Sequence, residues 1–177
     1  MSLCGSVPAQ SDYDIANRID LIPAPRDITV SDVRIDLSGW RIILAEDSSL
    51  CRLGAEEINQ RLIALGAKNL PIILTPDASY PCIIVGSCRS PLCRLFTESL
   101  DVELTPENPG EQGYVIACGD VRGVPAILAG GSDEQGALYA CITLCRLIQK
   151  LHGNACLTSA QVRDWPDFKI RCNSILN

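Results

Sequence analysis

Apolar residues that recur every three or four positions predict an amphipathic helix over residues 50–65. Side-chain oxygens of Asp47-Ser48-Ser49 can cap its first turn, and Gly66 suits its end. The apolar positions are Leu50, Leu53, Ile58, Leu62 and Leu65. The opposite face carries Arg52, Glu56, Asn59 and Gln60, so this helix is expected to cover one side of a sheet.

A second helix is predicted to begin at Ser132, where Ser132 and Gln135 have the spacing of a capping box. Its apolar stripe consists of Leu138, Cys141, Ile142, Cys145 and Ile148. Lys150 follows near the C-terminal end, where a positive charge is favourable. A shorter and weaker pattern over residues 89–100 predicts a third, short helix.

Shorter apolar or alternating runs between these helices predict strands. They cover residues 33–37, 41–45, 71–74, 82–85, 113–118 and 124–129. Residues 119–123 fit a hairpin turn, and the two prolines in Leu21 to Arg26 predict an extended leading segment. A strand followed by a helix and a further strand predicts that the two strands pair in parallel through a crossover connection. The order predicts an α+β fold, a mixed β-sheet with two main helices packed on it.

Length and charge exclude several classes of protein. The 177 residues provide for one domain, and 15 basic against 21 acidic residues give a net charge of −6. Binding to a nucleic-acid backbone through global charge is therefore not expected. No apolar run is long enough to cross a membrane, so no membrane partner is expected, and residues 1–17 lack an export signal.

The ten cysteines fall mainly in helical or strand-like apolar patterns, which is typical of small buried core residues. Reduced thiols favour a cytoplasmic location, whereas a secreted or periplasmic location requires a signal peptide that was removed. The Cys88–Cys93 and Cys141–Cys145 spacings do not form zinc knuckles, and His152 is the single histidine. We expect no metal and no other cofactor.

Two short motifs are candidates for a phosphate-binding or catalytic site. The turn at residues 129–136 resembles a phosphate loop, but two acidic residues in the first helical turn favour a capped helix. Cys88 and Arg94 have the Cys-x5-Arg spacing of thiol-dependent phosphatases. The loop lacks the glycine of that signature, and Ser87 and Leu95 stand where a histidine and a Ser or Thr are needed. A phosphatase is therefore a remote alternative.

Other catalytic groups have weaker support. His152 is expected just past a helix end, where an exposed histidine or one that interacts favourably with the helix dipole is common. With one histidine and no Gly-x-Ser-x-Gly motif, a serine-type catalytic triad has little support. Asp101 and Glu103 lie in a segment without a clear pattern. Glycoside hydrolysis needs two carboxyl groups about 5 to 10 Å apart, and no such pair is indicated.

The tail is the most informative segment. Trp165 and Phe168 flank Pro166 in an extended stretch, and residues 169–177 continue as a strand-like run. Domain ends are normally polar and frayed, so an apolar strand here suggests the start of a further domain.

The sequence resembles the non-catalytic α+β domain that precedes the (β/α)8 barrel in several glycoside hydrolases. These are the family 20 β-N-acetylhexosaminidases, with related layouts in families 84 and 67. The resemblance rests on Leu-Ile-Pro-Ala-Pro-Arg at 21–26, Cys-Ile-Ile-Val-Gly at 82–86, Gly-Glu-Gln-Gly-Tyr-Val-Ile at 110–116, and residues 136–148 and 162–171. It covers residues 20–172.

The resemblance implies a hexosaminidase-like, zincin-like fold, although the chain lacks the His-Glu-x-x-His motif of zinc enzymes. It implies a flexible segment at 1–20, an accessory domain at 21–163, and a linker with the first barrel strand at 164–177. Trp165, Pro166 and Phe168 are then interdomain docking residues. Arg171 matches a substrate-binding arginine of family 20, while Cys172 replaces the glycine that follows it there.

These observations lead to three hypotheses. In the first, the chain is the non-catalytic N-terminal accessory domain of a multidomain glycoside hydrolase, whose catalytic barrel follows in cis and binds the carbohydrate. The second is a freestanding carbohydrate-binding or interaction module, for which Tyr80 and Tyr114 would have to be exposed and coplanar. The third is the Cys88 and Arg94 phosphatase.

Overall fold

The structure is a computed structural model that describes residues 21–75 and 79–167. It contains an eight-stranded mixed sheet and three helices, which confirms the α+β class. The strands are β1 (Asp27–Asp36), β2 (Arg41–Leu44), β3 (Ile72–Ile73), β4 (Cys82–Ser87), β5 (Tyr114–Val121), β6 (Val124–Gly131), β7 (Ile148–Leu151) and β8 (Asn154–Asp164). The helices are α2 (Ser49–Ala64), α3 (Pro91–Ser99) and α4 (Glu134–Leu147).

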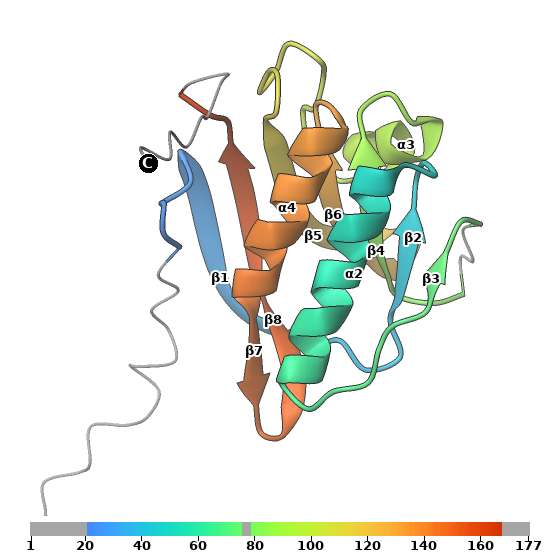
Figure 1. The fold of residues 1–177 in the computed structure, drawn as a ribbon. Coiled ribbons are helices and arrows are strands. Elements are labelled where there is room, and N and C mark those ends of the chain that lie inside the picture. The colour runs from blue at the N-terminus through green and yellow to red at the C-terminus, as the bar shows by residue number, and fades with distance from the viewer. Residues whose placement is uncertain (1–20, 76–78, 168–177) are drawn as a thin grey trace, which may run out of the picture.

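The sheet order is β1-β8-β5-β6-β4-β2-β3, and β7 pairs with β8 (Figure 1). Strands β2, β3, β4 and β6 are mutually parallel, whereas β1, β5 and β8 pair antiparallel. The parallel pairing of β2 with β4 across α2 confirms the predicted crossover unit.

Two layers of core lie on opposite faces of the sheet. Helices α2 and α4 lie side by side on one face and bury the larger core with residues such as Ile58, Ile83 and Leu144 (Figure 1). They approach closely at Gly54, where a Cβ atom would lie 2.8 Å from the Sγ of Cys141. Helix α3 covers part of the other face over a smaller core. The structure therefore has a third helix in addition to the two main ones.

The two main helices begin in different ways. The side chain of Ser48 accepts the N–H of Cys51 at 3.1 Å, as the capping pattern predicted. At α4 the predicted capping box is wrong: Asp133 is the N-cap and accepts the N–H of Gly136 at 2.7 Å. Ser132 lies one residue earlier, fully inside the fold, and its hydroxyl has no partner among the described residues.

The predicted helix faces need correction at three positions. Asn59 was assigned to the polar face of the first helix, but it is buried, and its amide exchanges two hydrogen bonds with the backbone of Leu70. Leu53 and Ile142 were assigned to apolar stripes but are exposed. Leu138 and Cys141 are buried as predicted, and Gly136, Ala137, Ala140, Leu144 and Leu147 complete the buried face of α4. On α2, Gly54 rather than Leu53 meets α4, because the helices approach too closely there for a larger side chain.

Three strand predictions are also corrected. Strand β1 begins at Asp27 rather than residue 33, and Val33 is exposed because β1 is an edge strand. Residues 119–121 continue β5, so the hairpin turn is Arg122-Gly123, with φ of +56° and +84°. Strand β7 was not predicted, and it places Lys150 in the sheet and His152 in the β7–β8 turn rather than past a helix end.

All eight cysteines that the structure describes are free thiols, six of them buried, as the patterns predicted. None of the described helices has the length and apolar character needed to span a membrane.

Candidate functional site at the end of strand β8

The end of β8 is held between two other strands. Asp164 is paired with Tyr114 on β5, and Arg163 is paired with Asp27 on β1. The leading segment 21–26 runs beside this point before it enters β1 (Figure 1). The sheet therefore fixes the place and direction in which the chain leaves the domain.

The carboxylate of Asp164 joins the leading segment to the sheet. Its Oδ1 accepts the backbone N–H of Arg26 at 3.2 Å, and its Oδ2 accepts the hydroxyl of Tyr114 at 3.3 Å. The Tyr114 hydroxyl also lies 2.7 Å from the Oγ1 of Thr143 on α4. Burial raises the pKa of Tyr114 to about 12, so this hydroxyl keeps its proton at neutral pH and can donate.

Trp165 is held by the side chain of Arg26. The guanidinium carbon lies 4.9 Å from the centroid of the indole ring, and Nε donates to the backbone oxygen of Trp165 at 3.4 Å. The same guanidinium forms an ion pair with Asp167. We call Arg26, Tyr114, Asp164 and Trp165 the junction clasp. These four residues hold the chain on both sides of the last sheet residue.

A cavity of about 240 Å³ lies next to the junction clasp. Leu21 and Pro23 of the leading segment form one wall, α4 forms another, and Pro166 of the tail a third. Arg146 of α4 reaches across and donates to the backbone oxygen of Ile22. The cavity combines apolar walls with hydroxyl, carboxylate and guanidinium groups.

Two of the predicted site residues are thus brought together with the clasp: Trp165 belongs to it and Pro166 lines the adjacent cavity. Phe168 and Arg171 lie outside the described residues. The roles of Arg26, Tyr114 and Asp164 were not predicted. The contacts join residues up to 139 positions apart, and a single sequence contains no periodicity that pairs them.

The structure contradicts the phosphatase alternative. Cys88 is buried and donates its thiol proton to the backbone oxygen of Ser132 at 3.2 Å. Burial raises the pKa of this thiol, whereas a nucleophilic cysteine needs a lowered one. Arg94 lies exposed on α3. The N–H groups of Cys88 and Ser90 already donate to backbone oxygens, so they are not available to a phosphate.

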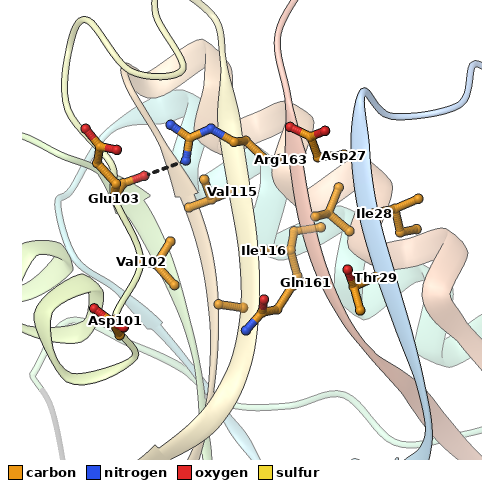
Figure 2. Close-up of a pocket in the computed structure, with 12 residues that line it drawn as sticks. Asp27, Ile28, Thr29, Asp101, Val102, Glu103, Val115, Ile116, Gln161 and Arg163 are labelled. Atoms are coloured by element: carbon orange, nitrogen blue, oxygen red, sulfur yellow. Dashed lines mark hydrogen bonds between the residues drawn. The ribbon is translucent and has the colours of Figure 1, made fainter.

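The carboxylates of Asp101 and Glu103 border a different hollow, of about 230 Å³, on the open face of the sheet. Figure 2 shows them on one side of β5, with Asp27 on β1 beyond β8. Arg163 donates to the backbone oxygen of Glu103, and the Glu103 carboxylate points away from the hollow (Figure 2). This arrangement does not set two carboxylates face to face, as glycoside hydrolysis requires.

The two tyrosines proposed as a sugar platform do not form one. Tyr114, a member of the junction clasp, is buried, whereas Tyr80 is exposed and lies just before β4, away from the clasp. Two coplanar exposed rings were the mark of a freestanding sugar-binding module, so this observation disfavours that hypothesis.

Among solved structures, the protein named CpGH84B is similar to this chain, with a TM-score of 0.60 and 22% identity over 87% of the chain. CpGH84D has a TM-score of 0.64 with 14% identity over 84%. An inactive mutant of the GH20 exo-β-N-acetylglucosaminidase from Vibrio harveyi has a TM-score of 0.53 with 17% identity over 84%. The fold is shared with part of these glycoside hydrolases.

The chain spans only 24% of each of the two GH84 chains and 19% of the Vibrio harveyi chain. No protein-family model and no curated protein matches the sequence. The resemblance to a portion of family 84 and family 20 enzymes that the sequence suggested is thus confirmed at the level of the fold.

Proposed function

We propose that this chain is the non-catalytic N-terminal accessory domain of a multidomain glycoside hydrolase, with the catalytic barrel following in cis. The main support is the likeness of fold: nearly the whole chain matches, but it covers at most a quarter of each of the three similar enzymes. Because the chain corresponds to so small a part of such enzymes, we expect the catalytic residues to lie in the remaining part of the full-length protein.

The proposed division is a flexible segment at 1–20, the accessory domain at 21–163, and a linker with the first barrel strand at 164–177. In this arrangement Trp165, Pro166 and Phe168 dock the two domains, and Arg171 contacts the substrate sugar. The zincin-like description of the domain and a cytoplasmic location, which the buried thiols favour, belong to the same proposal.

The junction clasp supplies a physical role for the domain. Because β8 is paired on both sides and Asp164 and Trp165 are bound to Arg26, the chain leaves the sheet in one direction. A barrel strand that starts a few residues later begins from a fixed point, so less conformational entropy is lost when it assembles. The domain would stabilise its neighbour and leave the reaction to it.

The test is to read the gene beyond Asn177 and to express the longer protein. We expect a continuous frame of about 250 to 300 residues, the size of a (β/α)8 barrel. In the longer protein, Trp165→Ala is expected to lower the unfolding temperature of the catalytic part. Trp40, which is buried at the other end of the domain, has no such link, so Trp40→Phe serves as the control. A stop codon directly after Asn177 would contradict the proposal.

A further inference from the structure

A groove of about 660 Å³ lies at the end of the domain opposite the junction clasp. Its walls are the turn before β2, the segment after α2 and the turn before β8. Asn154, at the start of β8, lines the groove, whereas Asp164, at the end of the same strand, belongs to the clasp. Ten residue steps at about 3.3 Å separate them by roughly 30 Å. A domain continuing from Asp164 therefore starts far from the groove.

The groove is positively charged in an acidic protein. Arg41 and Lys68 line it, and none of the lining residues among those that the structure describes is an aspartate or glutamate, although the chain has a net charge of −6. A third cation is near, because the Nζ of Lys150 lies 3.6 Å from the position that a Cβ on Gly66 would take. Clustered cations in a concave surface concentrate anions there.

The exposed carboxylate of Asp36 is hydrogen-bonded to two of the lining residues, Ser38 and Asn154. Its Oδ1 accepts both the N–H and the hydroxyl of Ser38, at 2.8 and 2.6 Å, and its Oδ2 accepts the amide of Asn154 at 2.7 Å. The Ser38 hydrogen bonds contribute most to lowering the Asp36 pKa. Both oxygens are thus used within the wall. The amide oxygen of Asn154 can still accept from a ligand hydroxyl.

Aromatic rings complete the lining. Trp40 and Tyr80 both line the groove, and the guanidinium carbon of Arg41 lies 3.5 Å from the centroid of the Tyr80 ring. This stacking holds the cation beside a ring that is 42% exposed. Trp40 is buried, so the exposed part of the Tyr80 ring is the aromatic surface that can contact the C–H face of a sugar. Amides bind the sugar hydroxyls, and guanidinium and ammonium groups bind carboxylate or sulfate.

We propose that this groove binds an acidic saccharide, one that carries carboxylate or sulfate groups. The choice of a saccharide rests on the proposed function, whereas the preference for an anion rests on the lining itself. The site would give the parent enzyme a second contact with its polymer, roughly 30 Å from the junction with the barrel.

The test uses three tetrasaccharides with the 177-residue chain, followed by NMR chemical shifts: hyaluronan with carboxylates, a heparin fragment with sulfates, and neutral chitotetraose. We expect saturable shifts in residues 38–41, 66–71 and 153–155 with at least one acidic probe and none with chitotetraose. Heparin carries carboxylates as well as sulfates, so shifts with heparin alone identify sulfate as the required group, whereas shifts with hyaluronan show that a carboxylate is sufficient.

The matched variants are Lys68→Gln in the groove and Arg94→Gln on α3, which remove the same charge from exposed positions. Lys68→Gln should weaken binding about threefold, and Arg94→Gln should leave it unchanged. Tyr80→Ala should also weaken it. If Lys68→Gln and Arg94→Gln weaken binding equally, the effect comes from net charge alone, and the proposed site is overturned.

Three other results would overturn the inference: no saturable shifts with either acidic probe, equal binding of chitotetraose, or shifts in these residues with adenosine monophosphate but not with the saccharides. None of them bears on the accessory role, which is tested by the reading frame beyond Asn177 and by the longer protein. Failure of one proposal is thus distinguishable from failure of the other.

Discussion

At the scale of single residues, the buried thiols determine how the protein responds to alkali. Burial raises the pKa of Cys51, Cys93 and Cys145 to about 12 and that of Cys82 to about 11. In the unfolded chain a thiol ionises near pH 9. Above that pH the unfolded state loses protons that the folded state keeps, so the free energy of unfolding falls as the pH rises from 9 towards 11.

We predict that urea unfolding under reducing conditions shows little change in the free energy of unfolding between pH 7 and 8.5. From pH 9 to 10.5 it should fall, by up to about 1 kcal/mol per pH unit for each such thiol. Cys93→Ala should lower the overall stability and make the alkaline slope shallower. An unchanged slope in this variant would show that the thiol does not titrate as described.

The start of α4 provides a second residue-level prediction. Asp133 accepts the N–H of Gly136 through Oδ1 and the N–H of Gln112 through Oδ2, at 2.7 and 2.8 Å. Asp133→Ala should therefore lower the free energy of unfolding by about 1 to 2 kcal/mol, measured by urea denaturation. Ser132→Ala, which removes a hydroxyl without a partner among the described residues, should cost less than about 0.5 kcal/mol. A larger loss of stability in Ser132→Ala than in Asp133→Ala would instead support the predicted capping box of Ser132 and Gln135.

Sequence alone could not choose between these two neighbouring caps, because the choice depends on a tertiary contact. Asp133 also binds Gln112, which lies 21 positions away and reaches the helix only after the sheet has formed. Asn59 was misplaced for the same reason: it looks like a surface residue until Leu70 folds back over it. Local patterns identify groups that can form a hydrogen bond but do not identify the partner.

At the scale of elements, the junction clasp is expected to hold residues 164–167 in place locally but to contribute little to the free energy of unfolding of the whole domain. Arg26 is partly exposed, so its contacts with Trp165 and Asp167 contribute little to the unfolding of the whole domain. We predict that Arg26→Gln increases amide exchange at Trp165 and the proteolytic sensitivity of residues 164–167, while the free energy of unfolding changes by less than about 1 kcal/mol.

The matched control is Arg52→Gln, which removes an exposed ion pair with Asp47 at the start of α2. It should leave exchange near Trp165 unaffected. If both variants, or neither, change exchange there, Arg26 does not hold the tail and the clasp is not a functional element.

Helices and parallel strands could be predicted well from the sequence, and the edges of the sheet could not. Helix α2 has a local cap in Ser48, and β4 is a continuous buried run, so each is recognisable in isolation. Strand β1 is exposed along most of its length, and β7 has four residues that directly follow a helix. The alternation in residues 33–37 predicts only the second half of β1, and β7 is too short to have a pattern of its own; the full extent of both strands depends on pairing with β8.

At the scale of the whole molecule, the two ends of β8 have different surroundings. One end carries the junction clasp beside the leading segment, and the other carries a groove with cations and aromatic rings. The resemblance to glycoside hydrolases could be found from short motifs because their order along the chain follows the fold. The clasp and the groove could not, because each is assembled from segments that meet only in three dimensions.

The central claim is that the reactive carboxyl groups lie outside this chain, and hydrolysis assays test it most directly. Purified chain and the longer protein are incubated with aryl glycosides, including an N-acetyl-β-glucosaminide and an α-glucuronide. We predict release of the aryl group by the longer protein and a rate equal to buffer alone for the chain. Release that increases in proportion to the concentration of the isolated chain would contradict the account.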